Sequence, residues 1–505
     1  MSSSKSKLAI LLLIVAAAVF VAVFGAYRWI SAVPEVRAFA PPGETAWVPR
    51  GPRKAGDSVH RVLPVPNAFH TMHVGTNNTD NLWIVAAPMV KHDWTAETDM
   101  YIAEGPTFDN EGNLYFTPLH PKEDISLVSL DRKTGRRRWT VPGKGAAHGA
   151  VLILNDPDHP GRQIIYHSTY TVAMALRPDG SVIWRTPTGL ETPERRPGEH
   201  DFTHAWGMNY HPQADAALGV TMDGHVHAHD RKTGRRLLRE PFRLPGAPAV
   251  VSYRPPAWAA RLANRETDAV FGRTADGRGL FSAITDVIFG NGFSIANYYA
   301  VDPNTGRLYI AATAPDEQDG ATDGVSHNGA LYLLELIRRP RGDHELKIVR
   351  YYAFKGGTGA TPTVSANSDR VMVSDDNGNV IALDGELNEL WRINVGAQVA
   401  ASIAVSPDND EIYAVNKFHI FKILDKGDSG EFAWRAELDA YPGFSNFNAL
   451  TPTITANGLA VSVGGGRRIG DAQIMLKAVS YTHLRAHETA MNIAYAVFCL
   501  KKGGG

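Results

Sequence analysis

A polar turn followed a few residues later by a tryptophan recurs along this chain of 505 residues. In each copy a short apolar strand runs into a turn containing Gly, and the next strand carries the Trp. Successive tryptophans lie 45 residues apart at Trp139 and Trp184, and 43 residues apart at Trp391 and Trp434. A period of about 40–45 residues, with four strands in each unit, is that of a propeller blade. The sequence therefore predicts an all-β chain folded as a seven- or eight-bladed β-propeller.

The turn sequences indicate how each unit folds locally. They read Asp-Arg-Lys-Thr-Gly at 131–135 and 230–234, Arg-Pro-Asp-Gly at 177–180, Asp-Gly at 384–385 and Lys-Gly-Asp-Ser-Gly at 426–430. Asp and Thr side chains hydrogen-bond to the backbone of such turns, while Gly takes the positive φ angle. Leu238 stands where the other copies have Trp. We expect the Trp side chains to pack between neighbouring blades and to take no part in chemistry.

A second recurrence marks the first strand of the blades, with Pro-Thr pairs at 106–107, 362–363 and 452–453. Together with the turns it predicts blades at 104–146, 147–203, 204–247, 295–357, 358–397 and 398–440, and a truncated last blade from 447. Residues 67–103 supply an eighth blade or complete the last one. Residues 248–294 do not fit the repeat and are predicted to be a partly helical insertion, so the propeller spans 67–478.

This repeat resembles that of the pyrroloquinoline-quinone-like (PQQ-like) β-propeller family, whose blades end in Asp-x-x-Thr-Gly followed by Trp. The resemblance covers about residues 104–478. It implies the fold but leaves the activity open, because the family includes quinoprotein dehydrogenases and non-catalytic assembly scaffolds of the bacterial envelope. Quinoprotein dehydrogenases often carry an adjacent cysteine pair beside the cofactor, and Cys499 is the single cysteine of this chain. PQQ or a divalent metal is thus compatible with the chain but not implied by it.

The N-terminal residues indicate a membrane anchor. Lys5 and Lys7 precede an uncharged apolar run from Leu8 to Ala26, which is long enough as a helix to span a bilayer. We expect residues 1–32 to be an uncleaved signal anchor, a single transmembrane helix in the inner membrane, and residues 33–66 to be a linker. The bulk of the chain would then be periplasmic. A cleaved signal peptide is the alternative, and Arg28 and Arg37 weaken the charge argument for orientation.

The C-terminal residues 479–505 resemble a translated sequencing adapter. The similarity covers residues 479–489 and 493–500, and the closing Lys-Lys-Gly-Gly-Gly resembles translated homopolymer runs. The authentic sequence is then expected to end near Ala478, without Cys499. Removing this segment changes the formal charge of −1 to about −3, a balance that does not favour nucleic acid as a partner.

The candidate functional residues lie at the start of the innermost strands, where a propeller has its central funnel. Superposing the repeats places Glu104, His148, His204 and Asn297 at equivalent funnel positions, with Ala360, Ala401 and Leu450 on the opposite arc. One polar arc facing a small or apolar one is typical of a ligand site. Glu104, His148 and His204 could hold a metal or share acid and base work, with Trp206 or Asn297 positioning a ligand. Alternatively, these side chains simply bind water.

Two further patterns have simpler interpretations. His225, His227 and His229 alternate, so their imidazoles share one face of a strand, and we expect an exposed strand edge rather than a metal site. The acidic segment 316–324 has spacing that could hold calcium but lacks the closing Glu of an EF-hand loop, so a solvated turn is expected.

These observations favour a membrane-anchored extracytoplasmic β-propeller that acts as a ligand- or protein-binding module. Its partner would be an envelope protein or a small ligand. The alternative is a quinone- or metal-dependent enzyme, an oxidoreductase or a hydrolase or lyase, with its site in the central funnel. The sequence alone does not decide whether the chain is catalytic.

Overall fold

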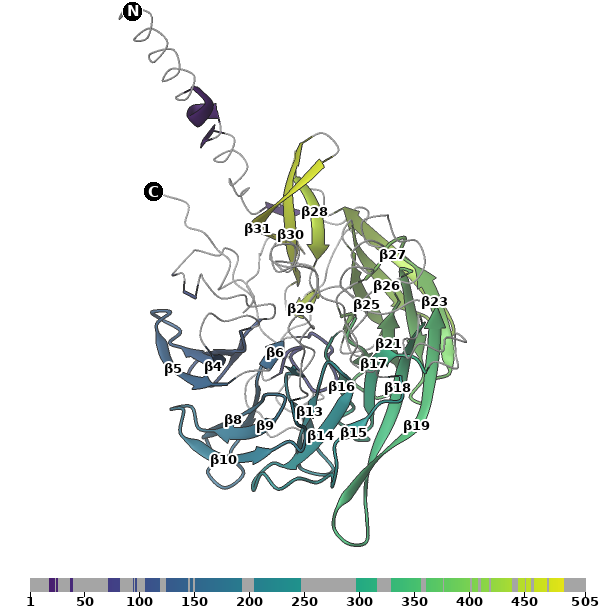
Figure 1. Ribbon diagram of the computed structural model, residues 1–505. Helices are drawn as coiled ribbons and strands as arrows, with labels where there is room; N and C mark the ends of the chain where they lie inside the picture. The colour runs from purple at the N-terminus through teal and green to yellow at the C-terminus, as the bar shows by residue number, and fades with distance from the viewer. Residues whose placement is uncertain are drawn as a thin grey trace, which may run out of the picture.

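The computed structural model describes the ranges 18–22, 24–25, 37–39, 71–81, 94, 96–97, 105–118, 124–143, 146–148, 150–192, 204–246, 297–315, 328–355, 360–375, 377–399, 402–406, 410–416, 419–437, 444–449, 451–455, 458–469 and 472–485. Within these ranges the chain is all-β apart from helical residues at 18–22 and 24–25. Six four-stranded antiparallel sheets stand around a common centre (Figure 1). This arrangement is consistent with a β-propeller.

The first three of these sheets follow one another along the chain, each as four consecutive antiparallel strands. They are β2 (Thr107–Phe108), β3 (Leu114–Phe116), β4 (Ile125–Leu130) and β5 (Arg137–Pro142); β7 (Leu152–Asn155), β8 (Gln163–Ser168), β9 (Val172–Leu176) and β10 (Val182–Pro187); and β12 (Asn209–His211), β13 (Ala216–Val220), β14 (His225–Asp230) and β15 (Phe242–Arg243). A two-stranded parallel pair, β6 (Ala146–His148) with β11 (Ala205–Trp206), lies beside them.

The next three sheets repeat the pattern with the same strand order. They are β16 (Ala300–Val301), β17 (Leu308–Thr313), β18 (Asn328–Arg338) and β19 (His344–Lys355); β20 (Thr363–Val364), β21 (Val371–Ser374), β22 (Asn379–Leu383) and β23 (Glu389–Asn394); and β24 (Ala404–Val405), β25 (Glu411–Val415), β26 (His419–Asp425) and β27 (Gly430–Glu437). Each of the six sheets falls inside one blade range predicted from the repeat.

A five-stranded sheet follows the sixth and differs from the others. It consists of β1 (Arg37–Phe39), β28 (Phe444–Ala449), β29 (Thr453–Thr455), β30 (Gly458–Ile469) and β31 (Ala472–Arg485). The outer partner of β31 is β1, which pairs with it in parallel. Strand β31 continues past residue 478 without a break, and the boundary expected there stays a prediction.

The turns form as the sequence predicts. Asp131 Oδ1 accepts hydrogen bonds from the backbone N–H of Lys133 (3.0 Å) and from the N–H and hydroxyl of Thr134 (2.8 Å each). The same contacts recur around Asp230. Gly135 has a φ of 66°, which only glycine adopts at little cost. The turns are therefore specified by residues within four positions of each other.

The repeated Trp side chains connect neighbouring sheets. Trp184 on β10 donates its indole N–H to the carbonyl of Arg231 in the next sheet (3.0 Å), and its ring lies over Gly234. Trp94 makes the same contact with Arg132 and Gly135 of the first sheet. Trp94 thus occupies the position of an outer-strand Trp preceding the first sheet, as expected if residues 67–103 contribute to a closing blade.

Other sequence interpretations fall mostly outside the structure's described ranges. These include the insertion at 248–294 and the acidic segment at 316–324. Of the expected anchor, residues 18–22 and 24–25 are described, and among the residues the structure covers no helix is long and apolar enough to cross a membrane. The anchor therefore stays a prediction.

Candidate functional site

The inner strands begin a few residues after the funnel positions assigned from the repeat. Five inner strands begin three residues after the funnel position assigned from the repeat, namely β2, β16, β20, β24 and β29. Strand β7 begins four residues after the funnel position assigned to its blade. Strand β12 begins five residues after His204. The described inner strands begin at one end of the ring, and the funnel positions are expected to lie there. We call this end the mouth.

Two of the predicted residues come together at the mouth. Residue 148 at the end of β6 pairs with Trp206 on β11 after a register shift between Ala205 and Trp206, so His148 and Trp206 lie on neighbouring strands. His204 immediately precedes β11, and its carbonyl accepts the N–H of Met222 (3.0 Å). Glu104 and the side chain of His148 lie outside the part of the chain that the structure describes. Whether Glu104, His148 and His204 converge on a metal stays a prediction.

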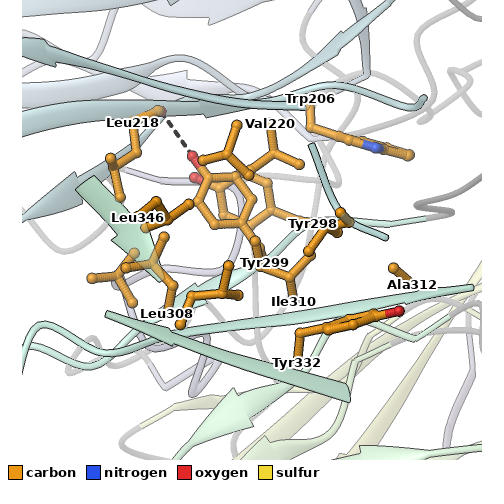
Figure 2. Packing of buried hydrophobic residues seen from close by; sticks show 14 of the residues in the cluster. Trp206, Leu218, Val220, Tyr298, Tyr299, Leu308, Ile310, Ala312, Tyr332 and Leu346 are labelled. Atoms are coloured by element: carbon orange, nitrogen blue, oxygen red, sulfur yellow. Dashed lines mark hydrogen bonds between the residues drawn. The ribbon is translucent and has the colours of Figure 1, made fainter. Parts of the chain in front are cut away.

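Trp206 and the two tyrosines after Asn297 belong to one buried apolar cluster. Trp206 is 2% exposed and packs in a large apolar cluster with Leu218, Tyr298 and Tyr299 (Figure 2). The Tyr299 hydroxyl donates to the carbonyl of Leu218 (2.7 Å), which fixes the ring between sheets. Asn297 is half-buried, and its Oδ1 accepts the N–H of Tyr298 (2.8 Å). In this structure Trp206 is thus a core side chain at the mouth.

An acidic group that the sequence did not single out lies near the mouth. Asp223 is 5% exposed and accepts hydrogen bonds from the hydroxyls of Thr221 and Tyr170, while His225 Nδ1 lies 3.1 Å from its Oδ1. Burial alone would raise the pKa of Asp223, but the nearby His225 and the hydrogen bonds from Thr221 and Tyr170 outweigh it and hold the pKa below its ordinary value. A buried carboxylate therefore joins the second sheet to the third.

Residues 71–81 occupy the centre of the ring, which no sequence pattern indicated. All eleven are buried. Their carbonyls accept N–H groups from the inner strands of successive sheets. The pairs are Val301 to Thr76 (2.7 Å), Val364 to Asn77 (2.8 Å), Val405 to Thr79 (3.1 Å) and Ile454 to Asp80 (2.8 Å). We call residues 71–81 the central segment.

Side-chain amides fix the central segment further. Asn77 Nδ2 donates to the carbonyl of Val364 and Asn78 Nδ2 to that of Pro362 (3.0 Å each). Asn209 on β12 donates to the carbonyl of Thr76 (3.0 Å). Asn78 has a φ of 59°, a conformation that Asn tolerates better than most residues. The segment therefore contacts the inner strands of five sheets.

One polar network in the central segment has the order of groups found in serine hydrolases. His73 Nδ1 lies 3.1 and 3.2 Å from the carboxylate oxygens of Asp80, and Ser402 Oγ lies 3.2 Å from His73 Nε2. Burial raises the pKa of Asp80, although the contact with His73 opposes the shift. Ser402 and Asp80 are 0% and 1% exposed, so no substrate reaches the hydroxyl in this structure. The network holds the central segment to β24.

Two of the three histidines of β14 are buried and His225 is half-buried, so the expected exposed edge is wrong for His227 and His229. His227 is 1% exposed and His229 is 0% exposed, with the ring of His229 stacked on Trp184 at 5.9 Å. Burial lowers the pKa of His227 well below its ordinary value and that of His229 to about 4. The ring of His229 packs on Trp184 of the neighbouring sheet and that of His227 packs against Gly219 and His229, which the alternation could not show. Among the described side chains, no group of three His, Cys, Asp or Glu is placed to hold a metal ion.

The fold and these contacts define the chain as an all-β protein of the propeller type with its centre filled by its own residues. No protein-family model and no curated protein matches the sequence. Among solved structures, the chain is similar to BamB from Moraxella catarrhalis, at 14% sequence identity and a TM-score of 0.39, over 82% of this chain and 94% of that chain.

Proposed function

We propose that this protein is a membrane-anchored, extracytoplasmic scaffold that binds a protein partner or a small ligand at the mouth and performs no chemistry itself. The observation that carries the proposal is the central segment. Residues 71–81 use their own backbone carbonyls to pair the inner strands of four successive sheets. A ligand at that depth would have to displace these bonds and leave buried N–H groups unpaired, which costs about 1–3 kcal/mol for each group.

The mouth remains the surface where recognition can occur. It carries His204 and Asn297, both half-buried, beside the buried carboxylate of Asp223. A rigid core lies directly beneath, because Trp206, Tyr298 and Tyr299 are closely packed. Polar groups held on a rigid base suit binding with little loss of conformational freedom. The expected partner is an envelope protein, since the anchor predicted at residues 1–32 would hold the ring at the inner membrane.

The alternative is a quinone- or metal-dependent enzyme with its site above the central segment. The pairing of β6 with β11 favours the enzyme. His148 ends β6 and His204 directly precedes β11, so the pairing brings the two residues onto neighbouring segments. The two hypotheses differ in what the mouth binds. An enzyme of this kind takes up PQQ or a divalent metal stoichiometrically, whereas a scaffold does not.

The test uses the purified full chain and three mouth variants, His148→Ala, His204→Ala and Glu104→Gln. Calorimetric titration with PQQ, Ca²⁺ and Zn²⁺ is expected to show no stoichiometric binding. In cells, a photo-crosslinking residue at position 204 should capture a defined envelope protein, and one at Lys133 should not. Lys133 is the matched control, since it is exposed in the turn that ends β4 away from the mouth. Tight binding of PQQ or metal that all three variants abolish would reject the scaffold and favour the enzyme.

A further inference from the structure

The hairpin formed by β18 and β19 is the longest in the four-stranded sheets. Its strands have 11 and 12 residues, whereas no strand of the other five such sheets exceeds the 8 residues of β27. Strand β17 pairs with β18 only as far as Leu334, so residues 335–338 and 344–347 pair with each other alone. This end of the hairpin therefore projects beyond its own sheet (Figure 1).

The third sheet holds the root of this projection. The N–H of His344 donates to the carbonyl of Leu237 (2.8 Å), and His344 forms a parallel bridge with Leu238. Leu346 is 4% exposed and belongs to the same apolar cluster as Leu237 and Leu238, with Leu336 packed against that cluster. Because its root is packed, the hairpin presents its tip in a fixed position, which lowers the entropic cost of binding a partner there.

Five exposed arginines flank the contact between the hairpin and the third sheet. Three follow the turn after β14 and two belong to the hairpin tip, and we call the five together the arginine surface: Arg235, Arg236, Arg239, Arg338 and Arg341. Among the residues that the structure describes, no carboxylate forms an ion pair with any of the five, whereas the neighbouring Arg339 pairs with Glu345 (2.9 Å).

The environment of His344 shows that the two groups of arginines act on the same place. Burial and the positive charges of Arg338 and Arg235 lower the pKa of His344. Arg338 comes from the hairpin and Arg235 from the third sheet, so charges from two sheets converge beside one imidazole. Like charges at close range repel each other, so this cluster does not stabilise the fold.

An exposed apolar side chain lies within the arginine surface. Ile337 precedes Arg338 on β18 and is 41% exposed. Arginine and apolar side chains on a rigid base are the composition of many protein interfaces. A cluster of one charge sign also raises the local concentration of oppositely charged groups and accelerates their association. The chemistry that fits this surface is therefore a set of carboxylates next to an apolar side chain.

We propose that the arginine surface, together with Ile337, is a docking surface for an acidic segment of a partner protein. Carboxylates of that segment pair with the guanidinium groups, and an apolar side chain of the segment covers Ile337. The β18–β19 turn lies at the end of its strands away from the mouth. The inference is therefore independent of the function proposed for the mouth, and either can fail without the other.

Two other occupants fit less well. A symmetric dimer of this chain would bring the arginines of one copy against those of the other, which repel. An anionic membrane would have to lie against the hairpin. Strand β1, the described strand that follows the predicted anchor, pairs with β31 on the opposite side of the ring from the hairpin (Figure 1).

The first measurement titrates the purified full chain, in neutral detergent at low salt, against a fluorescent peptide of alternating glutamate and valine. Replacing Arg235, Arg338 and Arg341 together with Ala should weaken binding by about tenfold in anisotropy. The matched control replaces Arg132, Lys133 and Arg136, which are exposed in the turn of the first sheet and carry the same total charge. The control should change the affinity by less than about twofold.

Equal thermal midpoints of the two triple variants would show that both are folded. An equal loss of affinity in both would mean that the peptide responds only to total charge, which refutes the proposal. The absence of measurable binding to the original chain would refute it as well.

The second measurement tests the apolar contact and the class of partner. Ile337→Ala should weaken binding of the peptide by about threefold, and Val182→Ala should leave it unchanged. Val182 is the matched control because it is 53% exposed on the outer strand of the second sheet. Equal effects of the two substitutions would remove Ile337 from the site. Displacement of the peptide by soluble short-chain phosphatidylglycerol as readily as by unlabelled peptide would assign the surface to a lipid and overturn the proposal.

Discussion

Stability should fall as the pH drops from 7.5 to 5.5, because burial lowers the pKa of four histidines. Burial lowers the pKa of His167 to about 3 and that of His211 and His229 to about 4, and places that of His227 well below its ordinary value. In the unfolded chain these groups titrate near pH 6.5. Between these values the unfolded state binds more protons, so their contribution to stability is complete above about pH 6.5 and is lost as the pH falls.

The magnitude follows from the printed shifts. Each histidine with a folded pKa near 3 or 4 lowers the free energy of unfolding by about 1.4 kcal/mol between pH 7.5 and pH 5.5. His167, His211 and His229 together therefore lower it by about 4 kcal/mol. His227 adds to this in the same direction. The carboxylates whose pKa is lowered, such as Asp131 and Asp223, lose their contribution only below about pH 4. The histidines therefore dominate the window from pH 6.5 to 4.

The assay is urea unfolding at pH 7.5 and 5.5, with His227→Phe as the diagnostic variant. Both ring nitrogens of His227 are buried without partners, so Phe loses no hydrogen bond and removes one titrating group. The variant should be at least as stable as the original at pH 7.5 and should lose about 1 kcal/mol less on acidification. His159→Phe is the control, since its side chain is 58% exposed and folding removes little of its water. Equal stability at both pH values, or an unchanged loss in His227→Phe, would refute the reasoning.

Four further predictions follow from the packing and the sequence. Trp184→Ala should destabilise by about 3–5 kcal/mol and Trp184→Phe by about 1 kcal/mol in urea unfolding, because only the former removes the ring between sheets. His73→Ala should lower the free energy of unfolding by about 2–3 kcal/mol, whereas Asp80→Asn should lower it by less than about 1 kcal/mol because Asn still bonds to His73. Equal losses in the two variants would show that the negative charge of Asp80 is needed. The protein should stay with membranes at high salt, and a soluble form beginning near Ala26 would show cleavage instead. Resequencing the gene without the same adapter should yield a different continuation after Ala478, and recovery of residues 479–505 would reject the adapter interpretation.

The repeat and its local chemistry could be predicted from the sequence because they depend on residues close together in the chain. Asp131 and Thr134 bond within a single turn, and Gly135 follows directly. The period of the turns placed each of the six sheets in its own range and put the funnel register within a few residues of the observed strand starts. The alternation on β14 was also visible, but it could not show whether His227 faces water or another sheet.

The centre of the ring was decided by tertiary structure alone. Asn209 reaches Thr76 across 133 residues, Asn77 reaches Val364 across 287, and Ser402 reaches His73 across 329. The segment 71–81 has no repeat of its own, so nothing in its sequence marks which inner strands it pairs with. Backbone carbonyls make most of these bonds, and every residue has one. The sequence therefore determined the blades through short-range turns and periodic apolar strands, whereas the filled channel and the buried His73, Asp80 and Ser402 network arise only when distant strands converge on one axis.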